Sequence, residues 1–209
     1  MSIKVRLEDA VSRLEKTDDY VEISDIGDEI WDLVDEMDAS TDPAVLPALG
    51  KAMDSDAATY FIEKAVDVVG QIGGVEAEKV LVNVRNDYTD TEDETYLKCG
   101  ELLASINPKK YISAVDNDAQ YQVIRSLVKK EDLDSLKAII GMTGDGIHLK
   151  NKQKMTLIWI SLEADNIELC KYLMESGVDA TQKNIYGESA LEYAVKNGNK
   201  SSTYLVQNA

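Results

Sequence analysis

The sequence of 209 residues has few of the side chains on which catalytic sites are built, with one histidine and two cysteines. No cluster of cysteines or aspartates accompanies the single histidine, His148, so metal-binding spacing is missing. A lone histidine also leaves no nucleophile–base pair of the kind that hydrolases use. We therefore expect no enzyme activity, no catalytic residue, no metal ligand and no cofactor in this chain.

Long apolar runs are missing as well. No stretch approaches the roughly 18 uninterrupted apolar residues of a membrane-spanning helix, and the opening MSIKVRLEDAVSRLEK is charged, unlike a signal peptide. Cys99 and Cys170 lie far apart on apolar, helix-like segments, which favours reduced and buried thiols. These features predict a cytoplasmic protein that does not bind membranes.

Basic side chains are scarce. The chain has 22 Lys and Arg against 39 Asp and Glu, a formal net charge of −17. Nucleic-acid binding is disfavoured, because the phosphate backbone rewards clustered lysine and arginine. Residues 1–115 hold 26 acidic and 11 basic side chains, whereas residues 116–209 hold 13 and 11. The sequence thus predicts an acidic half followed by a nearly neutral half.

The acidic excess is concentrated in DDYVEISDIGDEIWDLVDEMDASTD, residues 18–42, which holds eleven acidic side chains and no basic one. Ile26, Ile30, Leu33 and Met37 follow the spacing of one apolar helix face. We predict that the opposite face binds a basic protein partner; a solvated face that serves only solubility is the alternative. The predicted face consists of Asp25, Asp28, Glu29, Asp32, Asp35 and Glu36.

Few prolines and glycines leave room for many helices in the first half. AVLPALGKAMDSDAATYFIEKAVDVVGQIGGVEAEKVLVNV, with ETYLKCGELLASI after it, resembles HEAT repeats over roughly residues 43–107. Gly73 and Gly74 are expected to end a helix. The carboxylate-rich NDYTDTEDE, residues 86–94, lacks the glycine and the spacing of an EF-hand loop. It is expected to be a solvated loop, with weak cation binding as the alternative.

The second half contains an internal repeat. TLIWISLEADNIELCKYLMESGVDA (156–180) aligns with SALEYAVKNGNKSSTYLVQNA (189–209) at an offset of 33 residues, and Gly187 lies in the turn of KNIYGES. A further copy, YQVIRSLVKKEDLDSLKAIIGMTGDG, lies upstream at an offset of 34. The pattern resembles three ankyrin repeats across about residues 117–209. The family's loop-fixing histidine is replaced by Arg125, Trp159 and Glu192, so the resemblance alone does not establish the geometry of the finger turns.

The predicted fold is all-α: an α-solenoid of stacked helix pairs, HEAT-like over residues 1–115 and ankyrin over residues 116–209, with the two regions expected to be continuous. A polar final helix is expected to cap the array, through Lys200, Ser201, Ser202 and Gln207.

The ankyrin resemblance implies that partners are bound by the finger turns and by the inner side of each first helix. Tyr121, Met155, Ile185 and Tyr186 suit the core of such an interface, although scattered exposed apolar residues are also normal. The full predicted set is Asp118, Tyr121, Lys129, Lys130, Lys152, Gln153, Met155, Glu163, Ile185, Tyr186, Glu188, Lys196 and Asn197, with Ala119 beside them.

These features favour a non-catalytic protein-binding module. Its small size, one-sided acidity and lack of an effector domain favour an immunity protein or antitoxin that occludes a basic toxin or nuclease domain. One alternative is an ankyrin adaptor or scaffold that links two cellular proteins. Another is a lyase-like accessory subunit, because some HEAT-like proteins handle chromophores.

Overall fold

A computed structural model of the protein describes residues 1–88 and 90–209, so Thr89, within the predicted loop at 86–94, lies outside the described residues. The chain forms two compact units, Met1–Asn107 (unit 1) and Pro108–Ala209 (unit 2). The division falls at Pro108 rather than after residue 115, because a short segment that begins at Pro108 packs against the first long helix of unit 2. Regular structure in the described residues is helical, and the prediction of an all-α protein of stacked helix pairs is confirmed.

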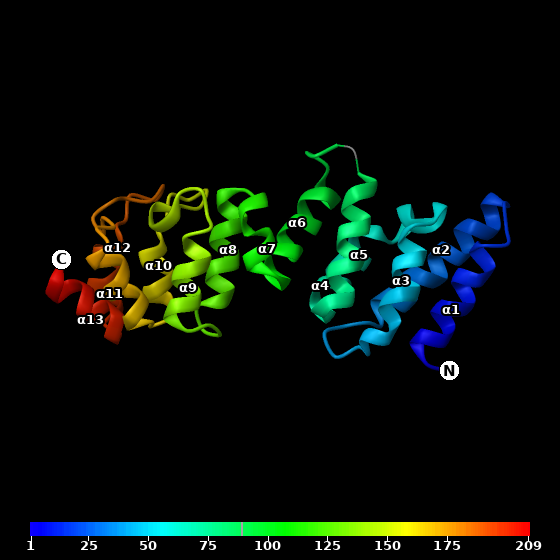
Figure 1. Ribbon diagram of the computed structural model, residues 1–209, viewed down its shortest axis with the longest axis horizontal. Coiled ribbons are helices and arrows are strands. Elements are labelled where there is room, and N and C mark those ends of the chain that lie inside the picture. The colour runs from blue at the N-terminus through cyan, green and yellow to red at the C-terminus, as the bar shows by residue number, and fades with distance from the viewer. Residues whose placement is uncertain (89) are drawn as a thin grey trace. The chain divides into compact units, whose positions relative to one another are not determined.

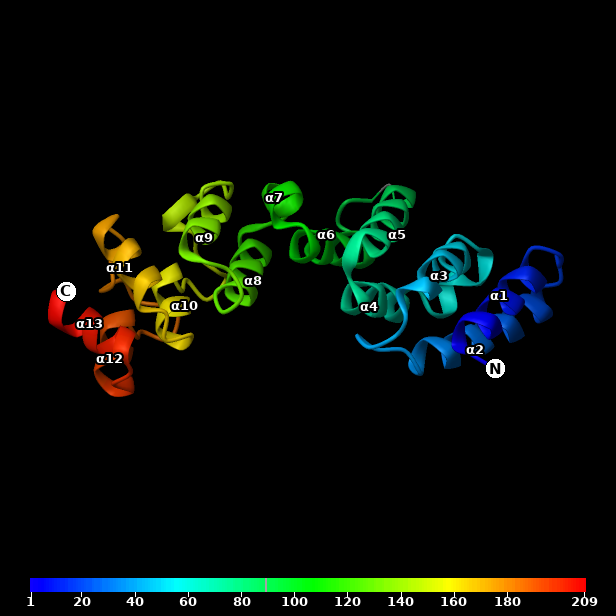
Figure 2. The ribbon, with the colours of Figure 1, turned by 60° about the horizontal axis from the view of Figure 1, so that its bottom comes forward.

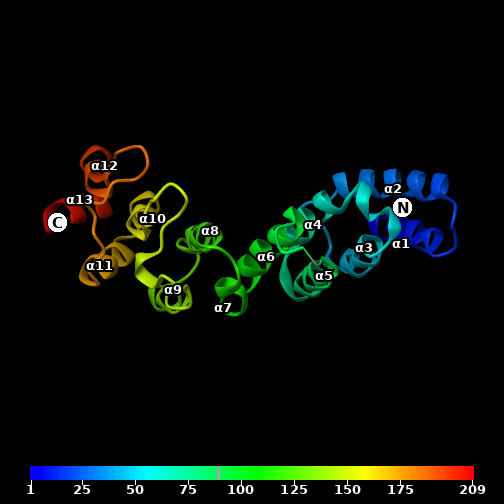
Figure 3. The same ribbon diagram turned by 90° about the horizontal axis from the view of Figure 1, so that it is seen from above.

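Unit 1 is built of helices arranged in two layers (Figures 1 and 3). The first layer holds α1, α3 and α5 side by side, and the second holds α2, α4 and α6. Their bounds are Ile3–Leu14 (α1), Tyr20–Asp35 (α2), Leu46–Met53 (α3), Ile62–Ile72 (α4), Gly74–Asp87 (α5) and Glu94–Ile106 (α6), with 3₁₀ turns at Pro43–Val45 and Asp56–Tyr60.

Local sequence signals set the ends of these helices. The Asp19 carboxylate accepts hydrogen bonds from the first amides of α2, as an N-cap does. Gly73, with φ of 67°, ends α4 in a backbone conformation that favours glycine. On α2 the predicted apolar stripe is buried, so its opposite face is left to solvent.

Unit 2 is built of three helix pairs, and its first helices and second helices form separate layers (Figure 3). Hairpin turns precede the second and third pairs and are closed by the bridges Lys150–Thr156 and Lys183–Ser189. The helix bounds are Pro108–Tyr111 (α7), Asn117–Leu127 (α8), Leu133–Ile140 (α9), Leu157–Glu163 (α10), Ile167–Glu175 (α11), Ala190–Asn197 (α12) and Lys200–Asn208 (α13).

A repeated asparagine joins successive pairs of unit 2. Asp132, Asn166 and Asn199 are the N-caps of α9, α11 and α13, spaced by 34 and 33 residues. The Asn166 amide also donates to the Val128 carbonyl at 3.1 Å, and the Asn199 amide donates to the Leu162 carbonyl at 2.7 Å. Each asparagine therefore caps its own helix and holds the preceding pair. The Asp132 side chain has no N–H to donate. This fits its place in the first pair, which has no preceding pair to hold.

The first pair has no finger turn before it, and the carboxylate of Asp118 makes the hydrogen bond that a preceding finger would make. In the third pair, the Ile185 amide donates to the Gln153 carbonyl of the preceding finger at 3.0 Å. Lys152 holds the equivalent position 33 residues earlier, and its amide donates to Asp118 Oδ1 on α8 at 2.9 Å. The Asp118 side chain thus substitutes for a backbone carbonyl and is committed to repeat packing.

The C-terminal end of unit 2 departs from the expected polar cap. Ser201 and Ser202 are buried, whereas Val195 of α12 and Val206 of α13 are exposed. The two serines lie in the first turn of α13, which packs against α11 and α12, and both are buried there. Of the polar residues expected outside, Lys200 and Gln207 are exposed.

Candidate protein-binding surfaces

The predicted acidic face of α2 divides into paired and unpaired carboxylates. Asp25, Asp28 and Asp32 lie on one exposed stripe at spacings of three and four residues, and within residues 1–88 and 90–209 none of them forms an ion pair. The other three carboxylates are held by cations of neighbouring helices, in the pairs Glu29–Arg13, Asp35–Lys64 and Glu36–Arg6. The free stripe is thus half of the predicted set.

The acidic surface extends from α2 onto α4 and α6, which the sequence reasoning missed. Lys64 of α4 reaches Asp35 of α2, and Lys98 of α6 reaches Asp67 of α4 at 2.9 Å, so each lysine joins successive helices of the layer. Asp67 raises the pKa of Lys98 through this hydrogen bond, with further help from carboxylates on α6. We call this surface the α2–α4–α6 face; its further carboxylates are Glu63, Asp67, Glu94 and Glu101.

An aromatic side chain lies within this acidic surface. Trp31 of α2 is partly exposed, and the Lys64 ammonium lies 5.0 Å from the centre of its ring. A cation over the face of an indole is attracted by the negative potential of the ring. The face therefore already binds one lysine ammonium group through an aromatic ring and a carboxylate. A basic partner could be bound by the same two kinds of contact.

The net negative charge of the chain lies in unit 1. Unit 1 holds 26 acidic and 9 basic side chains, a net formal charge of −17, whereas unit 2 holds 13 of each. Because Lys109 and Lys110 belong to unit 2, the contrast is sharper than the division after residue 115 suggests. A cavity of about 540 Å³ in the other layer of unit 1, between α3 and α5, is lined by side chains of both signs, among them Lys51, Lys79 and Asp87.

The finger of the third pair is folded by its own side chains. Asn184 Oδ1 accepts hydrogen bonds from the amides of Tyr186 at 2.9 Å and Glu188 at 3.1 Å. Gly187 follows with φ of 79°, which glycine adopts without strain. The turn leaves two apolar side chains in solvent, Ile185 with 54% and Tyr186 with 74% of their surface exposed.

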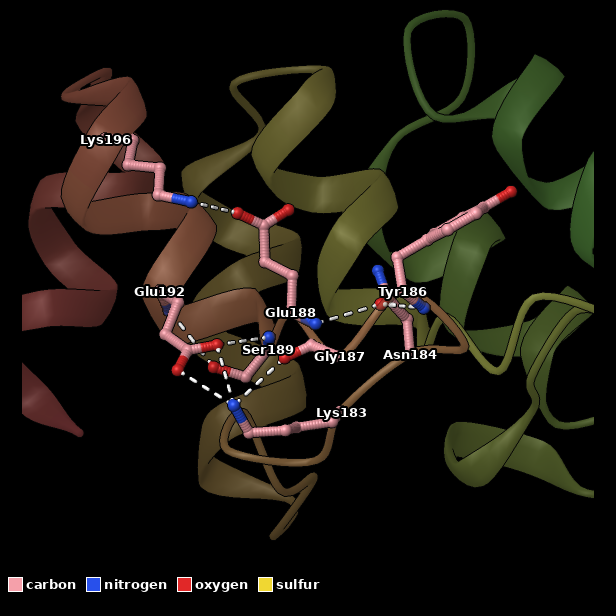
Figure 4. Close-up of polar contacts among 8 residues, drawn as sticks. All are labelled: Lys183, Asn184, Tyr186, Gly187, Glu188, Ser189, Glu192 and Lys196. Atoms are coloured by element: carbon pink, nitrogen blue, oxygen red, sulfur yellow. Dashed lines mark hydrogen bonds and ion pairs between the residues drawn. The ribbon is translucent and has the colours of Figure 1, made fainter.

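A charged network fixes this finger to α12 (Figure 4). The Lys183 ammonium donates to the Gly187 carbonyl and to Glu192 Oε1, both at 3.0 Å. Glu192 Oε2 accepts from the Ser189 amide at 2.8 Å, and Ser189 Oγ accepts from the Glu192 amide, which completes a capping box. The Ser189 amide, and then Lys183, hold the pKa of Glu192 below its usual value.

A second contact braces the finger from its other side. Lys196 of α12 donates to Glu188 at 2.5 Å, and this carboxylate raises the pKa of Lys196. Tyr186 points away from both sets of contacts (Figure 4). The finger is therefore a braced turn whose tip carries an exposed aromatic ring.

A family model described as "Ankyrin repeats (3 copies)" matches residues 114–209. Unit 2 is an ankyrin-repeat array. No curated protein and no solved structure matched the chain in the corresponding searches. Ankyrin arrays are protein–protein interaction modules, so the finger and the first helices of unit 2 are the expected contact surface.

The structure tests the exposure of the residues predicted on the ankyrin surface. Tyr121 is wrong as an interface residue: it is only 2% exposed, and its hydroxyl donates to the Thr156 carbonyl at 3.4 Å. It lies on the inward side of α8 with Ile124, and the C-cap Val128 continues that side. Alignment with the later repeats places Tyr121 in a finger, but the first ankyrin repeat has no finger. Ala119 is buried too.

The other predicted ankyrin positions fall into three groups. Some are tied to a neighbour, as Asp118 is to Lys152, Glu163 to Arg125 and Glu188 to Lys196. Gln153 and Met155 of the second finger are half-buried. Lys129, Lys130, Ile185, Tyr186 and Asn197 are exposed, and Lys152 and Lys196 are exposed as well as paired with Asp118 and Glu188.

Two further observations concern the described residues, 1–88 and 90–209. No three side chains of histidine, cysteine, aspartate or glutamate are placed there to hold a metal ion together. None of the helices described there combines the length and the apolar composition that crossing a membrane requires.

Proposed function

We propose that this protein is a non-catalytic, cytoplasmic binding protein whose partner is basic, and that it acts as an immunity protein or antitoxin. The partner would be a toxin or nuclease domain whose substrate-binding lysines and arginines are covered by carboxylates. The observation that carries the proposal is the unpaired stripe Asp25–Asp28–Asp32 on the α2–α4–α6 face of a unit with net charge −17.

Stability alone does not explain this stripe. Like charges three and four residues apart on a helix each destabilise it by about 0.2–0.5 kcal/mol. Ion pairs offset the charge of Glu29, Asp35 and Glu36 but not that of the stripe. Burial of the opposite face of α2 stabilises the fold despite this cost, at about 1.5–3 kcal/mol per large side chain. A basic partner would relieve the repulsion and be steered to the surface.

The ankyrin unit supplies the apolar part of the proposed contact. Ile185 and Tyr186 stand at the tip of a braced finger, and aromatic side chains with little entropy to lose are favoured at interface centres. Unit 2 has no net charge, so its contribution is shape and apolar area rather than steering. The proposal therefore assigns long-range attraction to unit 1 and short-range fit to unit 2.

The test begins with capture of the partner from native cells by the full chain, followed by its identification. We compare the wild type with a chain carrying Asp25→Lys, Asp28→Lys and Asp32→Lys. A matched control carries Asp54→Lys, Asp87→Lys and Glu175→Lys, which changes the net charge equally at exposed carboxylates outside the face.

We expect a partner with a basic isoelectric point, whose association slows by about tenfold or more in the α2 variant and by less than about twofold in the control. An acidic partner, or equal slowing by both variants, contradicts the acidic-face proposal. Co-expression with the partner tests the biological role separately. If the partner alone is not toxic to cells, the immunity role is wrong even where binding is confirmed.

An adaptor is the second candidate, favoured by the division into two units of very different charge. It predicts two different partners bound at once, and the immunity role predicts one. Sequential binding in a calorimeter distinguishes them, because a second captured protein binds the first complex only if the adaptor role holds. No observation on the described residues favours the lyase-like alternative.

A further inference from the structure

The ankyrin unit contains two series of equivalent residues at the junctions between its repeats. Val128, Leu162 and Val195 each lie four residues before the N-cap of the second helix of their repeat. Val128 and Leu162 are at most 4% exposed, because the next repeat covers them, whereas Val195 is 66% exposed. The third member of the series is therefore uncovered.

The second series behaves in the same way. Ile139, Leu173 and Val206 each lie seven residues after an N-cap. The first two are at most 2% exposed, and Val206 is 44% exposed. The helices α12 and α13 form the C-terminal end of unit 2 (Figure 2). Their outer side thus repeats the apolar pattern of a junction between repeats.

A groove runs between these two valines. It has a volume of about 230 Å³ and is lined by residues of α12 and α13, including Ser202. Ser202 is fully buried, and its Oγ has no hydrogen-bond partner among residues 1–88 and 90–209. A buried hydroxyl without a partner destabilises a protein, so a donor or acceptor entering the groove would remove a penalty already present.

We propose that the outer face of α12 and α13, formed by Val195, Val206 and the groove between them, binds a helix pair of a partner protein. The two junctions between repeats within unit 2 each show what a face of this kind binds. At each internal junction the occupant is a helix pair with apolar side chains and an asparagine that donates to a carbonyl, at Val128 and at Leu162. The equivalent carbonyl on the proposed face belongs to Val195.

Unit 2 of a second copy does not offer a free side of the kind by which one repeat docks onto the preceding repeat. The sides of α10–α11 and α12–α13 that dock onto a preceding repeat are already occupied within the unit. The corresponding side of α8 is covered by the segment Pro108–Ala114, whose Ile112 is buried. The occupant is therefore a helix pair from another protein, bound in continuation of the array and at a different place from the finger.

The test supplies a helix pair of known docking side. A second copy of residues 177–209 is appended directly after Ala209, which preserves the 33-residue period of the repeats. We expect amide hydrogen exchange of α12 and α13 to slow by about tenfold or more, as for helices that become internal to an array. Unchanged exchange in α12 and α13 overturns the proposal.

Two comparisons keep the result specific. Val195→Lys with Val206→Lys in the extended chain should remove the protection, because lysine ammonium groups would be buried at the junction. The matched pair Val5→Lys and Val75→Lys changes exposed valines of unit 1 and should leave the protection intact. Equal loss in both double variants contradicts the assignment of the face.

The unextended chain tests the choice of occupant. Sedimentation over a wide range of concentrations should show the same mass for the wild type and for the Val195→Lys, Val206→Lys variant. A concentration-dependent dimer that this variant abolishes would show that a second copy occupies the face, and the proposal of a partner's helix pair would then be wrong.

Discussion

Replacement of Asn199 tests how the ankyrin repeats are held together. Its Oδ1 accepts the Ser202 amide at 2.8 Å, and its amide donates to the Leu162 carbonyl at 2.7 Å. Loss of an asparagine N-cap costs about 1 kcal/mol, and loss of one hydrogen bond between neutral groups costs about 1 kcal/mol. Asn199→Ala should therefore lower the free energy of unfolding by about 2 kcal/mol.

The aspartate variant separates the two contributions. Asn199→Asp keeps the cap acceptor at a helix N-terminus, where negative charge is favourable, and loses only the amide donor. It should cost about 1 kcal/mol or less, which is the arrangement that Asp132 already has in the first repeat. Asn197→Ala, at an exposed asparagine two residues away, is the control and should stay within about 0.5 kcal/mol of the wild type.

Urea unfolding followed by circular dichroism gives these free energies, and hydrogen exchange of α11 and α13 assigns them to the junction. Exchange matters because two units unfold and a single transition does not say which of them lost stability. If Asn199→Asp is as destabilising as Asn199→Ala, the division into a cap contribution and a donor contribution is wrong. If Asn199→Ala costs no more than the control, the asparagine does not hold the repeats.

Three further outcomes follow from buried and paired groups. Hydrogen bonds from Ser189 and Lys183 lower the pKa of Glu192, so this carboxylate stabilises the finger fully at pH values above the ordinary glutamate pKa of about 4.3. The stabilisation is lost as the pH falls through the lowered pKa of Glu192. NMR titration of the finger tyrosine should show that transition in the wild type and not in Glu192→Gln. Burial raises the pKa of Cys99 to about 12, so a thiol reagent at pH 8 should leave Cys99 unmodified in the native protein and modify it in urea, and mass spectrometry that finds rapid native labelling would contradict its burial. Tyr121→Ala should lower the free energy of unfolding by about 3–5 kcal/mol and Tyr121→Phe by about 1 kcal/mol or less, since the hydroxyl makes one long hydrogen bond; similar costs in urea unfolding would contradict a packing role.

Much of the ankyrin half could be predicted from the sequence because its geometry is encoded locally. The 33-residue offset gives the repeat, Gly187 marks the finger turn with positive φ, and the asparagines at 166 and 199 lie at helix starts. Glu192 stands where the family has its histidine, and it holds the finger by accepting a hydrogen bond from Lys183. Only the structure shows this, because Lys183 and Glu192 meet across the finger.

What the sequence could not predict depends on contacts between helices. The carboxylates of α2 look alike in the sequence, yet Asp35 is paired and Asp32 is not, because Lys64 comes from a different helix. The 34-residue offset aligns Tyr121 with Met155 of the second finger and so predicts an interface position. Instead, α8 begins at Asn117, six residues before the position equivalent to the start of α10 at Leu157, and Tyr121 is buried on it.

The central claim is that the α2–α4–α6 face attracts a basic partner, and the association rate constant at increasing salt tests it most directly. Exposed charges are screened within about 10 Å at 0.1 M salt. Stopped-flow mixing with the captured partner should therefore give a rate constant that falls by about tenfold or more between about 50 and 500 mM salt. The Asp25, Asp28 and Asp32 charge-reversal variant should show a much shallower fall. A wild-type rate constant that is independent of salt would contradict the account.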